Sequence, residues 1–260
     1  MVQFYKYQAT GNDFVIIDNR DNGRSFTKDE VQAICDRKFG IGADGLMLIE
    51  NHAELDFNLV YYNSDGSQSL CGNGSRAAVT FASKLGIVDG NATFNAYDGP
   101  HEAEILKEGV VRLKMKDVAL VERQGDDLII NTGSPHFIRF VKGVREFPVF
   151  DEGRKIRYGV QFGPSGTNAN FVELEHDNTI FVRTYERGVE NETLSCGTGV
   201  TAAALAARFH GYSSPVKIKT LGGELQVEFD YNDRTPTKPL FSSVHLIGPA
   251  KMVFKGELEL

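Results

Sequence analysis

The sequence has no tryptophan, only three cysteines, and no long uninterrupted apolar run. Three cysteines in 260 residues are not the framework of a disulfide-stapled domain, so we expect reduced thiols. No apolar run approaches the roughly 18 residues that a membrane-spanning helix needs. The first residues also lack the basic and then apolar pattern of a secretion signal. The sequence therefore predicts a cytoplasmic protein with no membrane partner.

Positive charge is scarce as well. There are 28 Lys and Arg residues against 35 Asp and Glu residues, which gives a formal net charge of -7. A nucleic-acid-binding surface needs clustered Lys and Arg to neutralise phosphates, so we expect no nucleic-acid partner. The six histidines are scattered without ligand spacing, so we expect no metal site. These exclusions leave a small polar molecule as the expected ligand.

Short strand-like runs bounded by Gly, Asn and Asp dominate the chain. Several of them alternate apolar and polar residues, which is typical of antiparallel sheet with one buried face. The runs that predict strands are 14–18, 46–50, 57–62, 110–115, 127–132, 170–174, 179–185, 216–220, 224–229, 242–248 and 250–260.

Helical signals are fewer. Residues 27–40 predict a helix with Thr27 as N-cap, Glu30 completing a capping box and Gly40 as terminator. The other two expected helices follow Cys71 and Cys196.

The helices after the two cysteines repeat one another. The segments CGNGSRAAVTFASKLG (71–86) and CGTGVTAAALAARFHG (196–211) share 7 of 16 positions and end on Gly86 and Gly211. A repeat half a chain apart indicates a duplicated fold. Each helix is apolar around most of its circumference, which indicates that other structure encloses it. We therefore expect an α+β fold of two pseudo-symmetric domains, each a mostly antiparallel sheet or barrel around a central helix.

The repeat also predicts the domain boundaries. We expect an N-terminal half over 1–117, to which a C-terminal strand at 249–260 returns, and a second half over 118–248.

Each repeat places a cysteine before Gly-x-Gly at a helix start. The unpaired amides of the first turn and the helix dipole favour an anion there, and the same field lowers a thiol pKa. Two matched sites indicate a symmetric reaction. Inversion of a carbon centre is such a reaction, because one thiolate removes a proton from one face and one thiol returns a proton to the other.

Three other interpretations compete with this one. A buried Cys at a helix start is often a packing residue. Two cysteines brought together could form a redox pair, although the sequence has no C-x-x-C. The stretch GNGSRA at 72–77 also fits a weak dinucleotide-binding pattern, but it lacks a preceding strand and a well-placed acidic residue.

A set of motifs along the chain resembles those of the diaminopimelate epimerase family. They are TGNDF (10–14), GIGADG (40–45), YNSDGSQSLCGNGSR (62–76), GSPHF (133–137), TNANF (167–171) and ERGVENETLSCGTG (186–199), and they occur in order over nearly the whole chain. The resemblance implies an isomerase without a cofactor that interconverts LL- and meso-diaminopimelate for lysine and peptidoglycan synthesis. It also implies two similar domains with the active site between them, and commonly a homodimer.

The resemblance carries over residue by residue. It implies that Cys71 and Cys196 are the catalytic acid and base and that His136 and Glu186 assist them. The substrate-binding residues that it implies are Asn12, Asn63, Gly72, Asn73, Asn168, Glu186, Arg187, Gly197 and Thr198. The guanidinium of Arg187 independently suits a carboxylate at the distal end of the substrate. Asn12 and Asn63 could instead serve turns, and Arg187 could be a surface charge.

The sequence departs from the family pattern in a few places. Gly45 stands where many members have a substrate-contacting Gln, and Ser134 stands where many have Asn. The segment from Asn63 to Cys71 is one residue shorter than usual, and that from Glu186 to Cys196 is one longer. Proline racemases and phenazine-biosynthesis-type isomerases share the two-half fold and are the nearest alternative, followed by a thiol redox or binding protein on the same scaffold.

Overall fold

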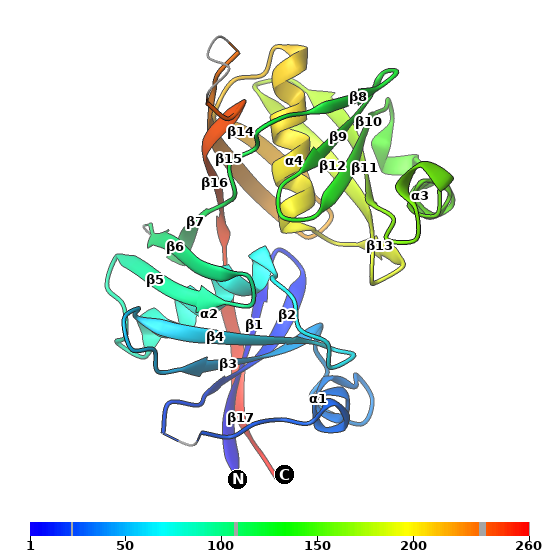
Figure 1. Cartoon of the computed structure of the whole chain (residues 1–260). Helices are drawn as coiled ribbons and strands as arrows, with labels where there is room; N and C mark the ends of the chain where they lie inside the picture. The colour runs from blue at the N-terminus through cyan, green and yellow to red at the C-terminus, as the bar shows by residue number, and fades with distance from the viewer. Residues whose placement is uncertain (22, 107–108, 234–237, 260) are drawn as a thin grey trace. The chain divides into compact units, whose positions relative to one another are not determined.

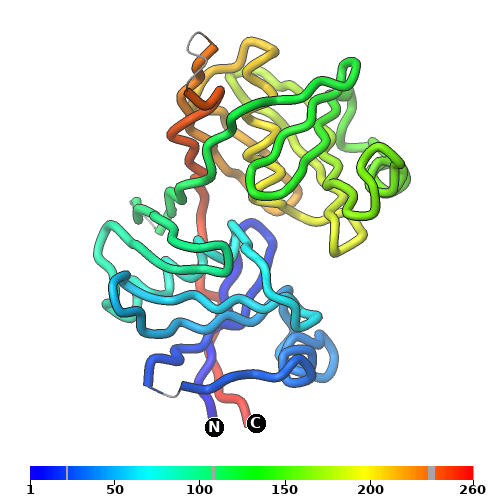
Figure 2. Tube along the Cα trace, viewed as in Figure 1, coloured from blue at the N-terminus to red at the C-terminus, as the bar shows by residue number. Residues whose placement is uncertain are grey.

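The computed structural model describes residues 1–21, 23–106, 109–233 and 238–259. The chain forms two compact units, one of residues Met1–Leu113 with Gly248–Leu260 and one of residues Lys114–Ile247. In the first unit, β17 (Lys251–Leu258) pairs antiparallel with β1 (Val2–Ala9), so the end of the chain lies beside its beginning, as Figures 1 and 2 show.

The described part of the first unit is a mixed sheet with two α-helices. Besides β1 and β17 it contains β2 (Asn12–Asp18), β3 (Gly45–Glu50), β4 (Phe57–Asn63), β5 (Asn91–Ala96), β6 (Gly99–Ile105), β7 (Val110–Lys114), α1 (Lys28–Cys35) and α2 (Gly72–Lys84). From β1 to β7 neighbouring strands pair in chain order, and β2–β3 and β4–β5 are the parallel ladders among the described residues.

The second unit has the same plan. It contains β8 (Glu122–Gln124), β9 (Asp127–Asn131), β10 (Pro135–Phe140), β11 (Asn168–Glu175), β12 (Thr179–Glu186), β13 (Asn191–Thr193), β14 (Val216–Thr220), β15 (Gly223–Tyr231), β16 (Phe241–Pro249), α3 (Val149–Arg157), α4 (Gly197–Ala207), and the 3₁₀ turns Val144–Glu146, Val160–Phe162 and Arg208–His210. Here β10–β11 and β12–β14 are parallel, while β9–β10, β11–β12, β14–β15 and β15–β16 are antiparallel.

The order of ladders is the same in both units. Each begins with an antiparallel pair, then alternates parallel, antiparallel and parallel ladders, and ends with antiparallel pairs. A helix fills the connection within the first parallel pair (α1 or α3), and a second helix precedes the last strand of the second parallel pair (α2 or α4). The fold is therefore a duplicated α+β unit, as the repeated cysteine segments predicted.

The two repeated helices are the centres of their units. Helix α2 packs against β1, β2, β3, β4, β6 and β17, and α4 packs against β9, β10, β11, β12, β14 and β15. Both helices are buried on most of their circumference. This explains their many small residues, because Ala lets strands approach from every side. Gly86 and Gly211 both have left-handed backbone, and they end α2 and the 3₁₀ turn after α4. The prediction of two enclosed helices with glycine terminators is confirmed.

The outer helices cover the opposite faces of the sheets. Helix α1 buries Val31 and Ile34 in a core with Val15 and Ile17 of β2, while the central helix covers the other face. Strands buried on both faces have nearly continuous apolar sequences rather than alternating ones. This explains why residues 14–17 read FVII and are all buried.

The predicted helix over 27–40 has the right start and the wrong end. Thr27 and Glu30 form the expected capping box. The helix stops at Cys35, however, because the Asp36 carboxylate accepts the backbone N–H groups of Lys38 and Phe39, each at 2.7 Å, and turns the chain away. Gly40 serves that turn instead, since a Cβ there would lie 2.0 Å from the Ala33 carbonyl oxygen.

Some elements had no clear signal in the sequence. The predicted strands are present with ends shifted by at most two residues, and Leu260 of the last one lies outside the described residues. The strands β1, β5, β6, β8, β10 and β13 and the helix α3 were not predicted. Helix α3 begins after a proline and carries Gly153 at its centre, where the backbone lies so close to Tyr185 that a Cβ would be 2.3 Å from it. Among the described helices, none is long and apolar enough to cross a membrane.

Candidate functional site

Cys71 is the N-cap of the central helix in the first unit. Its backbone is extended, and its Sγ accepts the Gly74 N–H at 3.3 Å. Gly74 has little room, since a Cβ there would lie 3.3 Å from Met47 Sδ and 3.4 Å from Cys71 Cβ. The first turn therefore holds the sulfur against the Gly74 N–H at the positive end of the helix dipole, where a thiolate is favoured.

Asn73 links this helix start to Asn12 at the start of β2. The Asn73 amide donates to Asn12 Oδ1, and Asn12 Nδ2 donates to Asp44 Oδ2 at 2.8 Å. Asn73 is buried and Gly72 beside it is too. The structure thus brings three of the sequence-predicted binding residues, Asn12, Gly72 and Asn73, to one end of α2.

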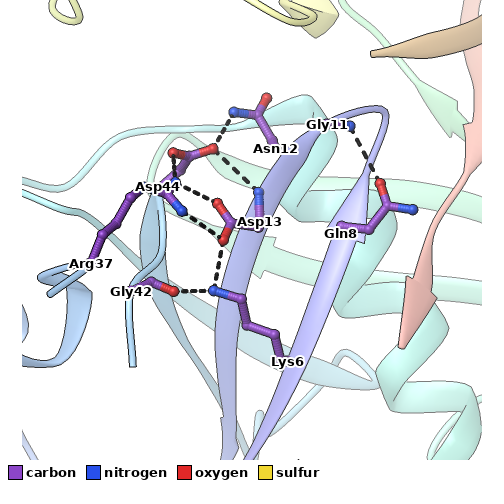
Figure 3. A network of polar contacts seen from close by, with 8 residues as sticks. All are labelled: Lys6, Gln8, Gly11, Asn12, Asp13, Arg37, Gly42 and Asp44. Atoms are coloured by element: carbon purple, nitrogen blue, oxygen red, sulfur yellow. Dashed lines mark hydrogen bonds and ion pairs between the residues drawn. The ribbon is translucent and has the colours of Figure 1, made fainter. Parts of the chain in front are cut away.

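A network of charges supports Asn12 from below (Figure 3). Arg37 donates to both Asp13 and Asp44 at 2.7 Å, and Lys6 pairs with Asp13 at 2.7 Å. Burial raises the pKa of Asp13, but hydrogen bonds from Arg37 and Lys6 outweigh it and hold that pKa below its usual range. Two cations and two carboxylates balance, so this network fixes the orientation of Asn12 without adding net charge.

Asn63 ends β4 and holds the turn that leads to Cys71. Its Nδ2 donates to Ser67 Oγ at 3.0 Å and to Ser69 Oγ at 3.1 Å, and its backbone N–H donates to the Ser67 carbonyl. Asn63 therefore makes the turn contacts that the sequence allowed as an alternative to substrate binding, and its role as a binding residue stays a prediction.

Cys196 is the N-cap of the central helix in the second unit. It is 6% exposed, and its Sγ lies 3.6 Å from the Thr198 hydroxyl. The Thr198 carbonyl oxygen accepts from the Thr132 hydroxyl at 2.8 Å, which fixes the first turn. A Cβ on Gly199 would lie 2.5 Å from Asn170 Oδ1 and 3.3 Å from Cys196 Sγ. The helix start therefore has no room for a side chain at that position.

A line of hydrogen bonds leads from the sheet to Thr198. Asn170 Nδ2 lies 3.2 Å from His136 Nδ1 and donates to the Phe137 carbonyl at 3.0 Å. Because an amide nitrogen can only donate, His136 Nδ1 is the acceptor and Nε2 carries the proton. That N–H faces Ser134 Oγ at 3.0 Å, and Ser134 Oγ lies 3.3 Å from Thr198 Oγ1. His136 is thus connected to Cys196 through two hydroxyl groups.

His136 is a neutral imidazole. It is fully buried, and burial together with the positive charge of Arg187 lowers the pKa of His136 to about 3. At neutral pH it therefore donates a hydrogen bond in a fixed tautomer and carries no charge.

The remaining predicted residues lie where β11 starts and β12 ends. Asn168 Oδ1 accepts the Arg187 backbone N–H at 2.9 Å, and Asn168 Nδ2 lies 3.3 Å from Ser134 Oγ. Glu186 accepts from the Thr193 hydroxyl at 2.8 Å, and the Arg187 guanidinium donates to the Ser165 carbonyl at 3.3 Å. Asn168, Glu186 and Arg187 thus belong to the same polar end of the second unit as Cys196.

The sequence did not point to Asn170 or Arg76 as residues of the site. It also did not indicate that Ser134 makes hydrogen bonds there. Asn170 lies within the TNANF motif, but its burial beneath His136 follows only from the pairing of β10 with β11. A usable signal existed for Arg76, the one charged residue in the first ten positions of a helix that is otherwise small and apolar. It is fully buried.

The two positions that depart from the family pattern have different surroundings. At Gly45 a Cβ would lie 2.5 Å from Tyr61 Cε2 and 2.5 Å from the Tyr62 carbonyl oxygen, so the Tyr61 ring occupies the space that a side chain at 45 would need. Ser134 makes side-chain contacts to His136 at 3.0 Å and to Thr198 at 3.3 Å.

No cluster of His, Cys, Asp and Glu suited to a metal ion occurs in the described ranges. The three cysteines form no disulfide.

Comparison with known proteins gives consistent matches. Residues 4–121 and 128–253 match the family model described as diaminopimelate epimerase. The chain is 46% identical over 260 residues to the diaminopimelate epimerase of Flavobacterium psychrophilum, covering 98% of this chain and 99% of that one. It is 41% identical over 279 residues to the diaminopimelate epimerase of Aquifex aeolicus, covering 99% and 98%.

Solved structures match over the whole chain at low sequence identity. A phenazine biosynthesis protein of the PhzF family from Bacillus anthracis has a TM-score of 0.73 at 15% identity, covering 100% of this chain and 99% of that one. A probable proline racemase from Agrobacterium radiobacter has a TM-score of 0.71 at 15% identity, covering 100% and 93%. At these identities the match shows a shared two-half α+β fold alone.

Proposed function

Because this chain belongs to the diaminopimelate epimerase family, we propose that it interconverts LL- and meso-diaminopimelate in lysine and peptidoglycan synthesis, using two thiols and no cofactor. The observation that carries this proposal is the duplicated helix start. In each unit a cysteine is the N-cap of a central helix, followed by Gly-x-Gly. A pair of matched acid/base groups suits a carbon that must be deprotonated on one face and protonated on the other.

In the proposed reaction the substrate carbon loses its proton to one sulfur as a thiolate. The C–H bond electrons move toward the carboxylate, and the carbon becomes planar. The other sulfur, as a thiol, then gives its proton to the opposite face. One thiol and one thiolate remain, with their places exchanged. This cycle requires Cys71 and Cys196 to reach opposite faces of one carbon.

The helix starts supply the electrostatic part of catalysis. Negative charge builds up on the reacting carboxylate as the proton leaves, and first-turn amides at a helix N-terminus stabilise such charge. We assign this task to the backbone around Gly72 and Asn73 and around Gly197 and Thr198. Gly72, Asn73 and Gly197 are buried, which keeps these amides in fixed positions and away from bulk water.

His136 and Glu186 assist the thiols in different ways. The neutral imidazole of His136 donates toward Ser134, whose hydroxyl lies next to that of Thr198, and so it keeps a hydroxyl beside Cys196 Sγ. Glu186 is a carboxylate held by Thr193 and can accept a proton during turnover.

Recognition of the distal end of the substrate is assigned to Arg187 together with Asn12, Asn63 and Asn168. A guanidinium binds a carboxylate through two parallel hydrogen bonds, and amide side chains can both donate to a carboxylate and accept from an ammonium group. The only side-chain hydrogen bond of Arg187 among the described residues is the long one to Ser165, so most of its donors stay available for a ligand.

We also propose that the protein works in the cytoplasm as a homodimer. Three cysteines without a disulfide suit a reducing compartment. Size-exclusion chromatography with light scattering measures the oligomeric state directly.

The proposed function predicts a specific activity. Purified protein should convert LL-diaminopimelate to a mixture with the meso isomer after exhaustive chelation, and hydroxylamine, which attacks pyridoxal cofactors, should leave the rate unchanged. Chiral chromatography of the reaction mixture measures both. Turnover of proline or hydroxyproline with no conversion of LL-diaminopimelate would refute the assignment.

A further inference from the structure

Arg76 is a positively charged side chain inside the first unit. It lies on α2, five residues after Cys71, and it is 0% exposed. Its guanidinium folds back along the helix toward the first turn. One nitrogen donates to the Gly72 carbonyl at 3.3 Å, and the other donates to Asn73 Oδ1 at 3.0 Å and to Thr10 Oγ1 at 3.2 Å. The cation therefore lies under the helix start that Cys71 caps.

Among the described residues, no carboxylate accepts a hydrogen bond from this guanidinium. All the oxygens that accept from Arg76 are neutral, and its Nε has no hydrogen-bond partner among the described residues. Burial lowers the pKa of Arg76 to about 10, and a negative charge on Cys71 acts against that effect, so the two groups are close enough to interact. The guanidinium thus stays protonated at neutral pH. A buried cation without an anion is costly, so a negative charge nearby is strongly favoured.

We propose that Arg76 is a positioning residue that keeps Cys71 as a thiolate in the resting enzyme, while Cys196 rests as a protonated thiol. The two matched cysteines are therefore not equivalent before substrate binds. This inference rests on the proposed function for its role in turnover, but not for the protonation states themselves.

The second unit lacks this cation at the equivalent place. The repeat aligns Arg76 with Thr201, which is also buried and whose hydroxyl donates to the Gly197 carbonyl at 2.9 Å, as Arg76 does to Gly72. Both helices have the same dipole and both thiols sit at an N-cap. At this aligned position the surroundings of the two sulfurs differ, because the first unit has a buried positive charge and the second has a neutral hydroxyl.

Other charged groups near the two helices do not reverse this difference. In the first unit, Lys6, Asp13, Arg37 and Asp44 balance one another, as described above. Tyr5 and Tyr7 pack on Phe81, nearly three turns beyond Cys71. Asp18 of β2 is paired with Arg20 at 2.7 Å. The other titratable groups on strands packed against α2 are Glu50 of β3, Tyr61 and Tyr62 of β4, His101, Glu102 and Glu104 of β6, and Lys251, Lys255 and Glu257 of β17. In the second unit, His136 is neutral, and Glu186 and Arg187 at the end of β12 carry opposite charges. The other titratable groups on elements packed against α4 are Asp127 of β9, Arg139 of β10, Glu173 and Glu175 of β11, Arg183 and Tyr185 of β12, Lys217 and Lys219 of β14, Glu224, Glu228, Asp230 and Tyr231 of β15, and Arg208 and His210 of the 3₁₀ turn after α4.

The consequence for turnover is a defined starting state. A resting thiolate at Cys71 is the base that takes the first proton, and the thiol at Cys196 is the acid. The enzyme is then ready for whichever substrate isomer presents its α-proton to Cys71. Before it can repeat that direction, Cys71 must give its proton to solvent and Cys196 must take one up.

The inference is tested on the wild-type protein without substrate. Alkylation by iodoacetamide is measured as a function of pH, and peptide mapping by mass spectrometry resolves each cysteine. The pH midpoint is compared rather than the rate, because the cysteines differ in exposure. We expect the midpoint of Cys71 to lie at least about one pH unit below that of Cys196, as an opposite charge nearby produces. Cys35 is an internal reference, since burial raises the pKa of Cys35 to about 11.

Two variants separate the charge from the fold. Arg76→Gln removes the cation and should move the Cys71 midpoint up by about one pH unit or more, whereas Arg76→Lys should move it less. Arg20→Gln, which removes a surface cation of the same unit, is the matched control and should leave the midpoint unchanged. If Arg76→Gln does not fold, the comparison of the Cys71 and Cys196 midpoints in the wild-type protein still tests the inference. Equal midpoints for Cys71 and Cys196, or a lower one for Cys196, would overturn the inference, while wild-type epimerisation of LL-diaminopimelate would leave the proposed function standing.

Discussion

Cys71→Ala and Cys196→Ala should each reduce the epimerisation rate by about a thousandfold or more, because positioned general acids and bases contribute on that order and each variant leaves one face of the carbon without such a group. The fold should survive both changes. Cys71 and Cys196 each precede a helix of small residues, and alanine fits such a packed start. Circular dichroism and thermal unfolding check the fold, and chiral product analysis measures the rate.

Cys35 is the control for these substitutions. It is the last residue of α1, is 4% exposed and does not precede Gly-x-Gly, so Cys35→Ala should alter stability at most. If Cys71→Ala or Cys196→Ala kept more than a tenth of the wild-type rate while Cys35→Ala behaved as wild type, the two-thiol mechanism would be wrong.

Gly199→Ala should have the second largest effect, a loss of about a hundredfold in kcat, which is the scale on which misplacement of a catalytic group by about 1 Å acts. The new Cβ would lie 2.5 Å from Asn170 Oδ1. Asn170 cannot yield cheaply, because it accepts from Thr184 and donates to Phe137 and His136. The strain therefore moves the helix start and Cys196, or it breaks hydrogen bonds of about 1 kcal/mol each.

The repeat provides a matched comparison at Gly74. There a Cβ would meet Met47 Sδ at 3.3 Å, and a thioether side chain adjusts more readily than a buried amide held by several hydrogen bonds. Gly74→Ala should therefore reduce kcat far less than Gly199→Ala, although the two glycines hold the same place in the motif. A larger loss for Gly74→Ala would contradict this reading of the two helix starts.

The sequence predicted the helix ends that depend on residues close by in the chain. The capping box of Thr27 and Glu30 and the closing glycines Gly86 and Gly211 are recognisable because backbone geometry at a helix end demands those residues. The end of the first helix was missed because the Asp36 carboxylate competes with the helix for backbone N–H groups, and an Asp at that position is also compatible with a longer helix.

Elements defined by distant contacts could not be predicted. Helix α3 has only Val149, Gly153 and Ile156 buried, and its path depends on the close approach of Gly153 to Tyr185. The site shows the same division. The two cysteines are visible as a repeat, whereas the line from Asn170 through His136 to Ser134 exists only because β10 and β11 pair in one register.

Solvent deuterium incorporation tests the two-thiol mechanism most directly. With LL-diaminopimelate in deuterated water, the thiol that protonates the product carries a solvent deuteron, while the proton taken from the substrate stays on the other sulfur. Early in the reaction, mass spectrometry should therefore find deuterium at the inverted carbon of the product well before it appears in recovered substrate. Early product that retains mostly the original hydrogen would show that one base serves both faces, and would contradict the assignment of Cys71 and Cys196 as separate acid and base.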